Sequence, residues 1–102
     1  MNIFKKEEKG AYTFDGMESP VEVRYRVADA AEAETVIMDQ LKDTEIFEKF
    51  VLEAKCKDVD EWVEGVDADQ VIKTPGTFGL IHLVAVDIVN RMRMGVQRKN
   101  LQ

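Results

Sequence analysis

The strongest pattern in the chain is a nearly unbroken apolar run that extends from Phe78 to Val89. Three residues interrupt this run, namely Gly79, His82 and Asp87. A helix on the surface of a small globular protein normally carries one apolar stripe, whereas this run is apolar on almost all sides. We therefore expect it either to form the buried centre of the domain or to contact another chain.

Helix signals flank this run on both sides. Thr74 and Pro75 are typical of the first positions of a helix, and Gly95 is typical of the position just after a helix end. The pattern therefore predicts a helix from Pro75 to about Met94.

Strict alternation of apolar and charged residues marks a second region. The apolar positions of residues 21–27 are Val21, Val23, Tyr25 and Val27. This period of two predicts a strand with four apolar side chains on one face. Tyr12 and Phe14 alternate similarly, and the turn-forming residues 15–20 separate the two segments. The sequence thus predicts a β-hairpin. Because a hairpin alone is barely stable in water, its apolar face must rest on helices or on a second subunit.

Two further helices are predicted between the hairpin and residue 55. The first begins at Asp29, with Glu32 in the position that a capping box uses, and extends to Leu41. Asp43 or Thr44 is expected to cap the second helix. Its apolar residues recur at helical spacing, at Ile46, Phe47, Phe50, Val51 and Ala54. The short connection predicts that the two helices pack as antiparallel neighbours.

Residues 58–69 contain six acids and no base. Trp62, Val63 and Val66 predict a short helical turn that is held against the core. The acids suggest a cation site, but neither Asp58 nor Asp60 as the first residue reproduces the ligand spacing of a calcium-binding EF-hand loop. We therefore interpret these acids as helix caps and solvated side chains.

These elements predict an α+β fold that is mostly α, with an N-terminal β-hairpin followed by about three principal helices. We expect residues 1–102 to form a single domain, with residues 1–10 loosely ordered and residues 96–102 as a tail. A composition of 45% hydrophobic and 33% charged residues is typical of a globular protein.

Charge and hydrophobic length narrow the classes of partner and the location. The formal net charge of -6 argues against nonspecific binding to nucleic acid and to anionic membranes. The apolar run has about 12 residues, fewer than the roughly 20 that a membrane-spanning helix needs. No signal peptide is recognisable, and a single cysteine excludes an internal disulfide. We expect a cytoplasmic protein.

The sequence offers no constellation of catalytic or metal-binding residues. His82 is the only histidine, and it lacks the partners of a catalytic triad or a zinc site. Cys56 lies between two lysines but has no second cysteine to react with. Asp60 and Glu61 lie beside Trp62, without a spacing that indicates acid–base catalysis. We therefore expect neither an active site nor a cofactor nor a metal.

The carboxyl end is basic, with cations at Arg91, Arg93, Arg98 and Lys99. Cations at the end of a helix interact favourably with the negative pole of its dipole. The same residues could contact phosphates, so a small nucleic-acid-binding regulator remains an alternative.

The last helix carries more apolar surface than two helices and a hairpin cover comfortably. This excess predicts self-association or the binding of a partner helix. The candidate partner-binding residues are Phe47, Phe50, Trp62, Phe78, Ile81, Ala85, Ile88, Val89 and Met92. Methionines such as Met92 suit an adaptable binding surface, although filling of the core explains them equally well.

Roughly residues 20–98 resemble the small tail assembly chaperones of long-tailed bacteriophages. The resemblance rests on the strand VEVRYRV leading into a helix, on the phrase FEKFVLEAKCKDVDEWVEGVDADQV, and on the closing helix after Thr74, Pro75 and Gly76. It implies a non-enzymatic protein of the host cytoplasm that binds the hydrophobic tape measure protein until the tail tube forms. It also implies homo-oligomers.

A virion structural subunit, such as a head–tail connector or a tail terminator, is the main alternative. Such a subunit would use the same apolar helix to build a permanent ring. Its presence in purified particles would distinguish it from a chaperone, which should be absent from them.

Overall fold

The computed structural model describes residues 4, 6–13 and 16–93. Three strands form an antiparallel sheet in the order β1-β2-β3. The strands are β1 (Glu7–Tyr12), β2 (Val21–Arg26) and β3 (Val51–Lys55). The helices of this described part are α1 (Ala30–Asp39), α2 (Asp43–Phe50), the 3-10 helix η1 (Asp60–Trp62), α3 (Ala68–Lys73) and α4 (Phe78–Arg93). The predicted fold class, an N-terminal hairpin followed by helices in a mostly α chain, is confirmed.

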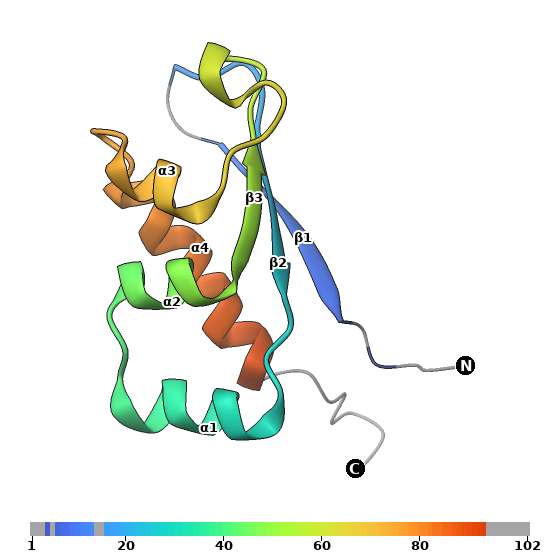
Figure 1. Cartoon of the computed structure of the whole chain (residues 1–102), viewed down its shortest axis with the longest axis vertical. Helices are drawn as coiled ribbons and strands as arrows, with labels where there is room; N and C mark the ends of the chain where they lie inside the picture. The colour runs from blue at the N-terminus through green and yellow to red at the C-terminus, as the bar shows by residue number, and fades with distance from the viewer. Residues whose placement is uncertain (1–3, 5, 14–15, 94–102) are drawn as a thin grey trace.

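The elements form two layers (Figure 1). Helices α2, α3 and α4 cover one face of the sheet, and α1 connects β2 to α2 at one end of the molecule. The other face of the sheet carries charged side chains. On it, Arg24 of β2 pairs with Glu7 of β1 at 2.9 Å, and Lys55 of β3 lies 3.9 Å from Glu53.

Strand β2 is the centre of the sheet and supplies the apolar face that the alternation predicted. Val21, Val23 and Tyr25 are buried, whereas Val27 lies beyond the strand and is exposed. The prediction of four buried positions was therefore wrong for Val27, because the strand ends at Arg26. Phe14 lies outside the described residues.

The second predicted helix extended through Ala54, and its last part was wrong. Helix α2 ends at Phe50, and the chain continues directly into β3. The helix ends here because residues 51–55 pair with the second edge of β2 as a strand. In this strand, Val51 and Ala54 are still buried in the core. A β-bulge places Leu52 outside the regular register opposite Arg24 and Tyr25.

The amino-terminal segment also differs from the prediction. Residues 7–10 belong to β1, although residues 1–10 were expected to be loosely ordered. Pairing with β2 orders them, and the backbone amide of Val27 extends the pairing by donating to the carbonyl of Lys6 at 2.8 Å. The predicted tail at residues 96–102 lies outside the described residues.

The start of α1 confirms the predicted capping box. The Asp29 carboxylate accepts from the backbone amide of Glu32 at 2.8 Å, and the Glu32 carboxylate accepts from the backbone amide of Asp29 at 3.3 Å. Arg26 then donates to both oxygens of Glu32, at 2.8 and 2.7 Å. These hydrogen bonds, the pair from Arg26 above all, lower the pKa of Glu32 to about 2. The cap thus attaches α1 to the end of β2.

The acidic segment holds the loop between β1 and β2 in place. The Asp58 carboxylate accepts from the backbone amides of Glu18 and Ser19, at 2.8 and 3.0 Å, and these bonds lower its pKa. Trp62 is buried at the end of η1, as the predicted short turn required. Val63, by contrast, is exposed. Asp58 therefore has a structural role, because it holds the loop between β1 and β2.

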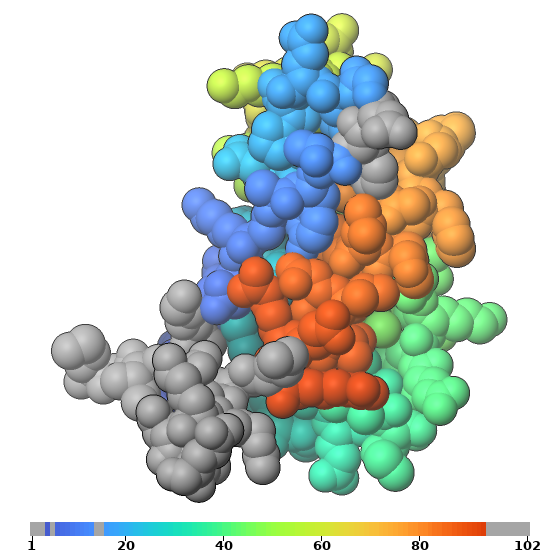
Figure 2. All heavy atoms as spheres, turned by 180° about the vertical axis from the view of Figure 1, so that it is seen from behind, coloured from blue at the N-terminus to red at the C-terminus, as the bar shows by residue number. Residues whose placement is uncertain are grey.

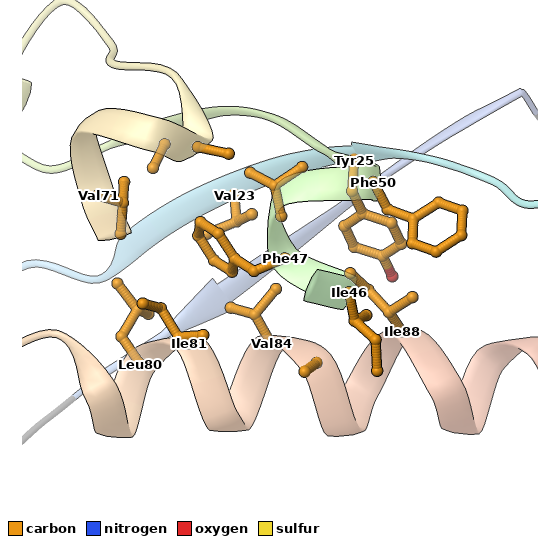
Figure 3. Close-up of a cluster of buried hydrophobic side chains, with 14 of the residues drawn as sticks. Val23, Tyr25, Ile46, Phe47, Phe50, Val71, Leu80, Ile81, Val84 and Ile88 are labelled. Carbon is orange, nitrogen blue, oxygen red and sulfur yellow. The ribbon is translucent and has the colours of Figure 1, made fainter. Parts of the chain in front are cut away.

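A single apolar cluster fills the space between the sheet and the helices (Figure 3). Side chains of α4 point toward β2 and toward the aromatic residues of α2. Phe47 and Phe50 have no exposed surface, and no charged or polar residue is buried in the described part of the chain. Burial of this apolar surface is the main favourable contribution to folding.

Replacing Phe47 by Ala should lower the free energy of unfolding by about 3–5 kcal/mol, because it leaves a cavity in the core. Replacing Phe78, which is exposed, by Ala is the matched control and should change this free energy by about 0.5 kcal/mol or less. Urea unfolding followed by circular dichroism measures both values. Equal effects of the two substitutions would contradict the assigned core.

Replacing Glu32 by Gln should destabilise the protein near neutral pH, because the variant loses the ion pair with Arg26. The folded-state pKa of Glu32 is depressed, so its stabilising effect is present above the ordinary carboxyl pKa of 4.5 and is lost as the pH falls toward 2. The difference in Tm between wild type and variant should therefore shrink over this range. A pH-independent difference would contradict the assignment, and the exposed Glu34→Gln on the same helix serves as the control.

Candidate partner-binding surface

Helix α4 begins three residues later than Pro75, where the sequence predicted it. Thr74 ends α3, and its hydroxyl donates to the carbonyl of Gln70 at 2.8 Å. Gly76 has a φ of +87°, which L side chains rarely adopt, and so permits a turn before α4. The hydroxyl of Thr77 donates to the carbonyl of Thr74 at 2.9 Å, and the carbonyl of Thr77 accepts the amide of Ile81. Thr77 therefore directly precedes the helix, as the sequence predicted for Thr74.

The two sides of α4 differ in their surroundings. The buried side consists of Leu80, Ile81, Val84, Ala85 and Ile88. On the other side, Phe78, Leu83 and Val86 are 72%, 44% and 41% exposed. Figure 2 shows α4 in the middle of one molecular face, between β1 and the α1–α2 segment. The apolar run is thus a core element on one side and leaves apolar side chains exposed on the other.

One groove on this face lies between α1 and α4 and has a volume of about 280 Å³. We call it the α1–α4 groove. Its lining residues are Val36, Ile37, Gln40, Leu41, Asp43, Ile46, Ala85, Val86, Val89, Asn90 and Arg93. Seven of these residues are apolar, and the two charged ones have opposite signs. The groove therefore offers an apolar surface between two helices.

A second groove, the β1–α4 groove, lies between β1 and α4, on the other side of the exposed Val86. It has a volume of about 410 Å³. Its lining residues are Gly10, Ala11, Tyr12, Leu83, Val86, Asp87, Asn90 and Arg91. Val86 lines both grooves, so it forms the ridge between them. Asp87 and Arg91 line only this second groove, whereas Asn90 lines both grooves.

Polar contacts connect β1 to α4 inside the β1–α4 groove. The Tyr12 hydroxyl donates to the Asp87 carboxylate at 2.7 Å, and Arg91 donates from Nε to the same carboxylate at 3.3 Å. Arg91 also reaches Glu8 of β1 at 3.5 Å. The hydroxyl of Tyr25 lies behind this cluster, buried, and has no hydrogen-bond partner among the described residues. These contacts fix the first strand against the helix.

Both tyrosines of the chain belong to this region, and their pKa values are raised. Burial is the main cause for each of them. It raises the pKa of Tyr25 to about 12, despite the opposing positive charge of Arg91. The pKa of Tyr12 is raised well above its ordinary value, because the hydrogen bond to Asp87 and the charge of Asp87 act in the same direction as burial.

The sequence-predicted partner-binding residues separate into two groups. Those with almost no exposed surface are Phe47, Phe50, Trp62, Ile81, Ala85 and Ile88. Because their side chains already pack in the core, they are not available as an open surface in this conformation. Phe78 is exposed, and Val89 and Met92 are partly buried against the core. Of the nine residues, Ala85 and Val89 line the α1–α4 groove.

Sequence reasoning missed the residues that make this surface. Ile37 and Leu41 of the first helix line the α1–α4 groove, and Leu83 and Val86 are exposed apolar residues of α4. Their spacing of three or four residues was visible in the sequence. However, α4 is apolar on nearly all sides, so its periodicity did not indicate which side faces the core.

His82 and Cys56, the remaining candidate residues for chemistry, each lie close to a polar group of the fold. His82 Nδ1 lies 2.7 Å from Asp43 Oδ2, at the start of α2. The thiol of Cys56 is buried and lies 4.0 Å from the carbonyl of Ser19. Within the described residues, no three His, Cys, Asp or Glu side chains are placed to hold a metal, and no helix is long and apolar enough to cross a membrane. Arg98 and Lys99 of the basic end lie outside these residues.

Comparisons with known protein families, with curated proteins and with solved structures find no match for this chain.

Titration with base should leave both tyrosines protonated while the protein is folded. A raised phenol pKa contributes stability that is complete below the ordinary value of 10 and is lost as the pH rises through the folded-state value. Tyrosinate absorbance should therefore stay absent at pH 10 and appear only near pH 12 or together with unfolding. Half-ionisation near pH 10 with a native circular dichroism spectrum would contradict the assigned burial.

Proposed function

We propose that this protein is a non-enzymatic binding protein of the host cytoplasm that shelters an apolar helix of a partner during phage tail assembly. The α1–α4 groove would hold the helix, and the tape measure protein would supply it. The observation that carries this proposal is the open apolar groove between α1 and α4, next to the exposed Val86. The choice of the tape measure protein rests on the resemblance of residues 20–98 to tail assembly chaperones.

The chemistry of the groove suits an amphipathic helix. Helix-in-groove recognition places apolar side chains, three or four residues apart, into an apolar groove of the receptor. Here Ile37 and Leu41 provide one wall, and Val86 and Val89 provide the other. Asp43 and Arg93 add one charge of each sign to the lining, so they select no strongly charged partner.

The size of the groove sets a limit on affinity. A volume of about 280 Å³ accommodates a few side chains and does not enclose a ligand. Temporary binding is what an assembly chaperone requires, because its partner must be released when the tail tube forms. The net charge of -6 would keep the complex soluble while apolar segments are covered.

Co-expression tests this proposal. The wild-type protein should increase the soluble fraction of a tape measure protein, and Val86→Asp should reduce this increase several-fold because it places a charge in the apolar groove. Val63→Asp is the matched control, since Val63 is 50% exposed and lies outside both grooves. The control should act like the wild type.

Two outcomes would contradict the proposal: no effect of the wild-type protein on the solubility of the tape measure protein, or equal effects of the two Asp variants. Finding the protein in purified phage particles would instead favour a permanent structural subunit.

A further inference from the structure

Strand β1 forms an open edge of the sheet. It pairs with β2 on one side, and among the described residues no strand lies on its other side. The opposite edge of the sheet is partly covered, because Ala54 of β3 pairs with Val66 in an isolated bridge. An open edge exposes backbone donors and acceptors that a further strand can bind.

The register of β1 and β2 identifies the backbone groups of β1 that point away from β2. Lys6 is aligned with Val27 and accepts its amide at 2.8 Å, so the backbone of Lys6 points toward β2. In an antiparallel pair, residues alternate between this orientation and the opposite one. The backbone groups of Glu7, Lys9 and Ala11 therefore point away from β2, toward the open edge.

Three of the six residues of β1 are charged, which is one feature that protects edge strands, but other such features are absent. The strand has six residues, contains no proline, and pairs with β2 without a bulge. Gly10 and Ala11 add no bulk, and both line the β1–α4 groove, which lies directly beside the edge. Lys9 is the only residue of β1 with a cationic side chain, and it faces the charged side of the sheet.

We propose that a second copy of this chain binds here, with the two β1 strands antiparallel and Gly10 on the two-fold axis. The sheet would then continue through six strands, with the helices of both copies on one face. This proposal does not depend on the proposed function, which uses the α1–α4 groove.

Charge selects this register from the alternatives. Outward-facing residues must pair with outward-facing residues, so the axis lies on one residue of β1. An axis on Glu8 places Glu8 against its own copy, and an axis on Lys9 places Lys9 against its own copy; like charges in direct opposition are destabilising. An axis on Gly10 pairs Lys9 with Ala11 of the other copy and Glu8 with Tyr12. It is the longest pairing within β1 that avoids both repulsions.

The side chains also suit an axis on Gly10. The Tyr12 ring lies over Gly10, where a Cβ atom would come within 2.8 Å of two ring carbons. A side chain at position 10 would therefore displace this ring. Two residues on the axis at this position form a non-hydrogen-bonded pair, in which the Cα atoms lie closest. Leu83 and Val86 line the groove beside each β1 edge, so the two copies would bring these exposed apolar side chains together across the axis. The two Lys9 side chains would lie diagonally across the axis from each other. Each would have Glu7 of its own strand as a neighbour on the same face of the sheet.

Light scattering over a dilution series, combined with cysteine cross-linking, tests the dimer and its register. A mixture of Lys9→Cys and Ala11→Cys proteins should form an intermolecular disulfide, because directly paired residues lie within the Cα distance that a disulfide spans. Each variant alone should not, and neither should a mixture of Glu7→Cys and Ala11→Cys, which reports an axis on Lys9. The buried native Cys56 should not react. A monomer at every concentration, or a dimer without the Lys9–Ala11 disulfide, would overturn the proposal.

A proline at position 11 tests the backbone contact itself. Ala11→Pro removes an outward-facing amide, whereas Ala11→Val keeps it and favours a strand. The dissociation constant of the dimer should rise at least about tenfold for Ala11→Pro and stay within about threefold of the wild type for Ala11→Val. A monomeric circular dichroism spectrum that matches the wild type verifies the fold of each variant. Equal dimerisation of both folded variants would overturn the edge pairing.

Discussion

The packing of one side of α4 against β2 and α2 is the contact on which the rest of the structure depends. Figure 3 shows Ile81 and Val84 pointing toward Val23 and Phe47, and Ile88 and Tyr25 belong to the same cluster. These residues come from three elements that are distant in the sequence, and each is almost fully buried. Because a hairpin alone is barely stable in water, burial of its apolar face against the helix stabilises it.

The same contact determines what remains exposed. Once five residues of α4 face the core, the helical period places Leu83 and Val86 on the outside. The neighbouring elements then form a groove on each side of Val86, one beside α1 and one beside β1. Our two proposals use these two grooves, which have Val86 in common. A partner helix would bind beside α1, and a second copy would bind at the edge of β1.

Local patterns were sufficient for several elements. Asp29 and Glu32 form the capping box that their spacing predicted, and the alternation of Val21, Val23 and Tyr25 correctly identified the buried face of a strand. These features depend on residues that are close in the chain. The carboxylate of Asp58, in contrast, accepts hydrogen bonds from residues that lie 39 and 40 positions away in the chain. No local pattern could therefore predict its contact with the hairpin loop.

The errors arose where long-range pairing overrides local spacing. Val51 and Ala54 follow Phe47 and Phe50 at helical intervals, yet the open edge of β2 draws them into a strand. The exposure of the predicted partner-binding residues was misjudged for a related reason, since an apolar run gives no periodic signal for its buried side. Six of the nine proposed residues are consequently buried. Ile37 and Leu41 line the groove but come from the first predicted helix, whose pattern indicated no binding role.

The most direct test of the central claim is an NMR titration of the labelled protein with an amphipathic peptide from a tape measure protein. We predict that the amide signals of α1 and of the outer side of α4, including Leu41, Val86 and Val89, shift together and saturate. Signals of η1 and of the charged sheet face should not change. Shifts confined to these other regions, or an unchanged spectrum at excess peptide, would contradict binding in the α1–α4 groove.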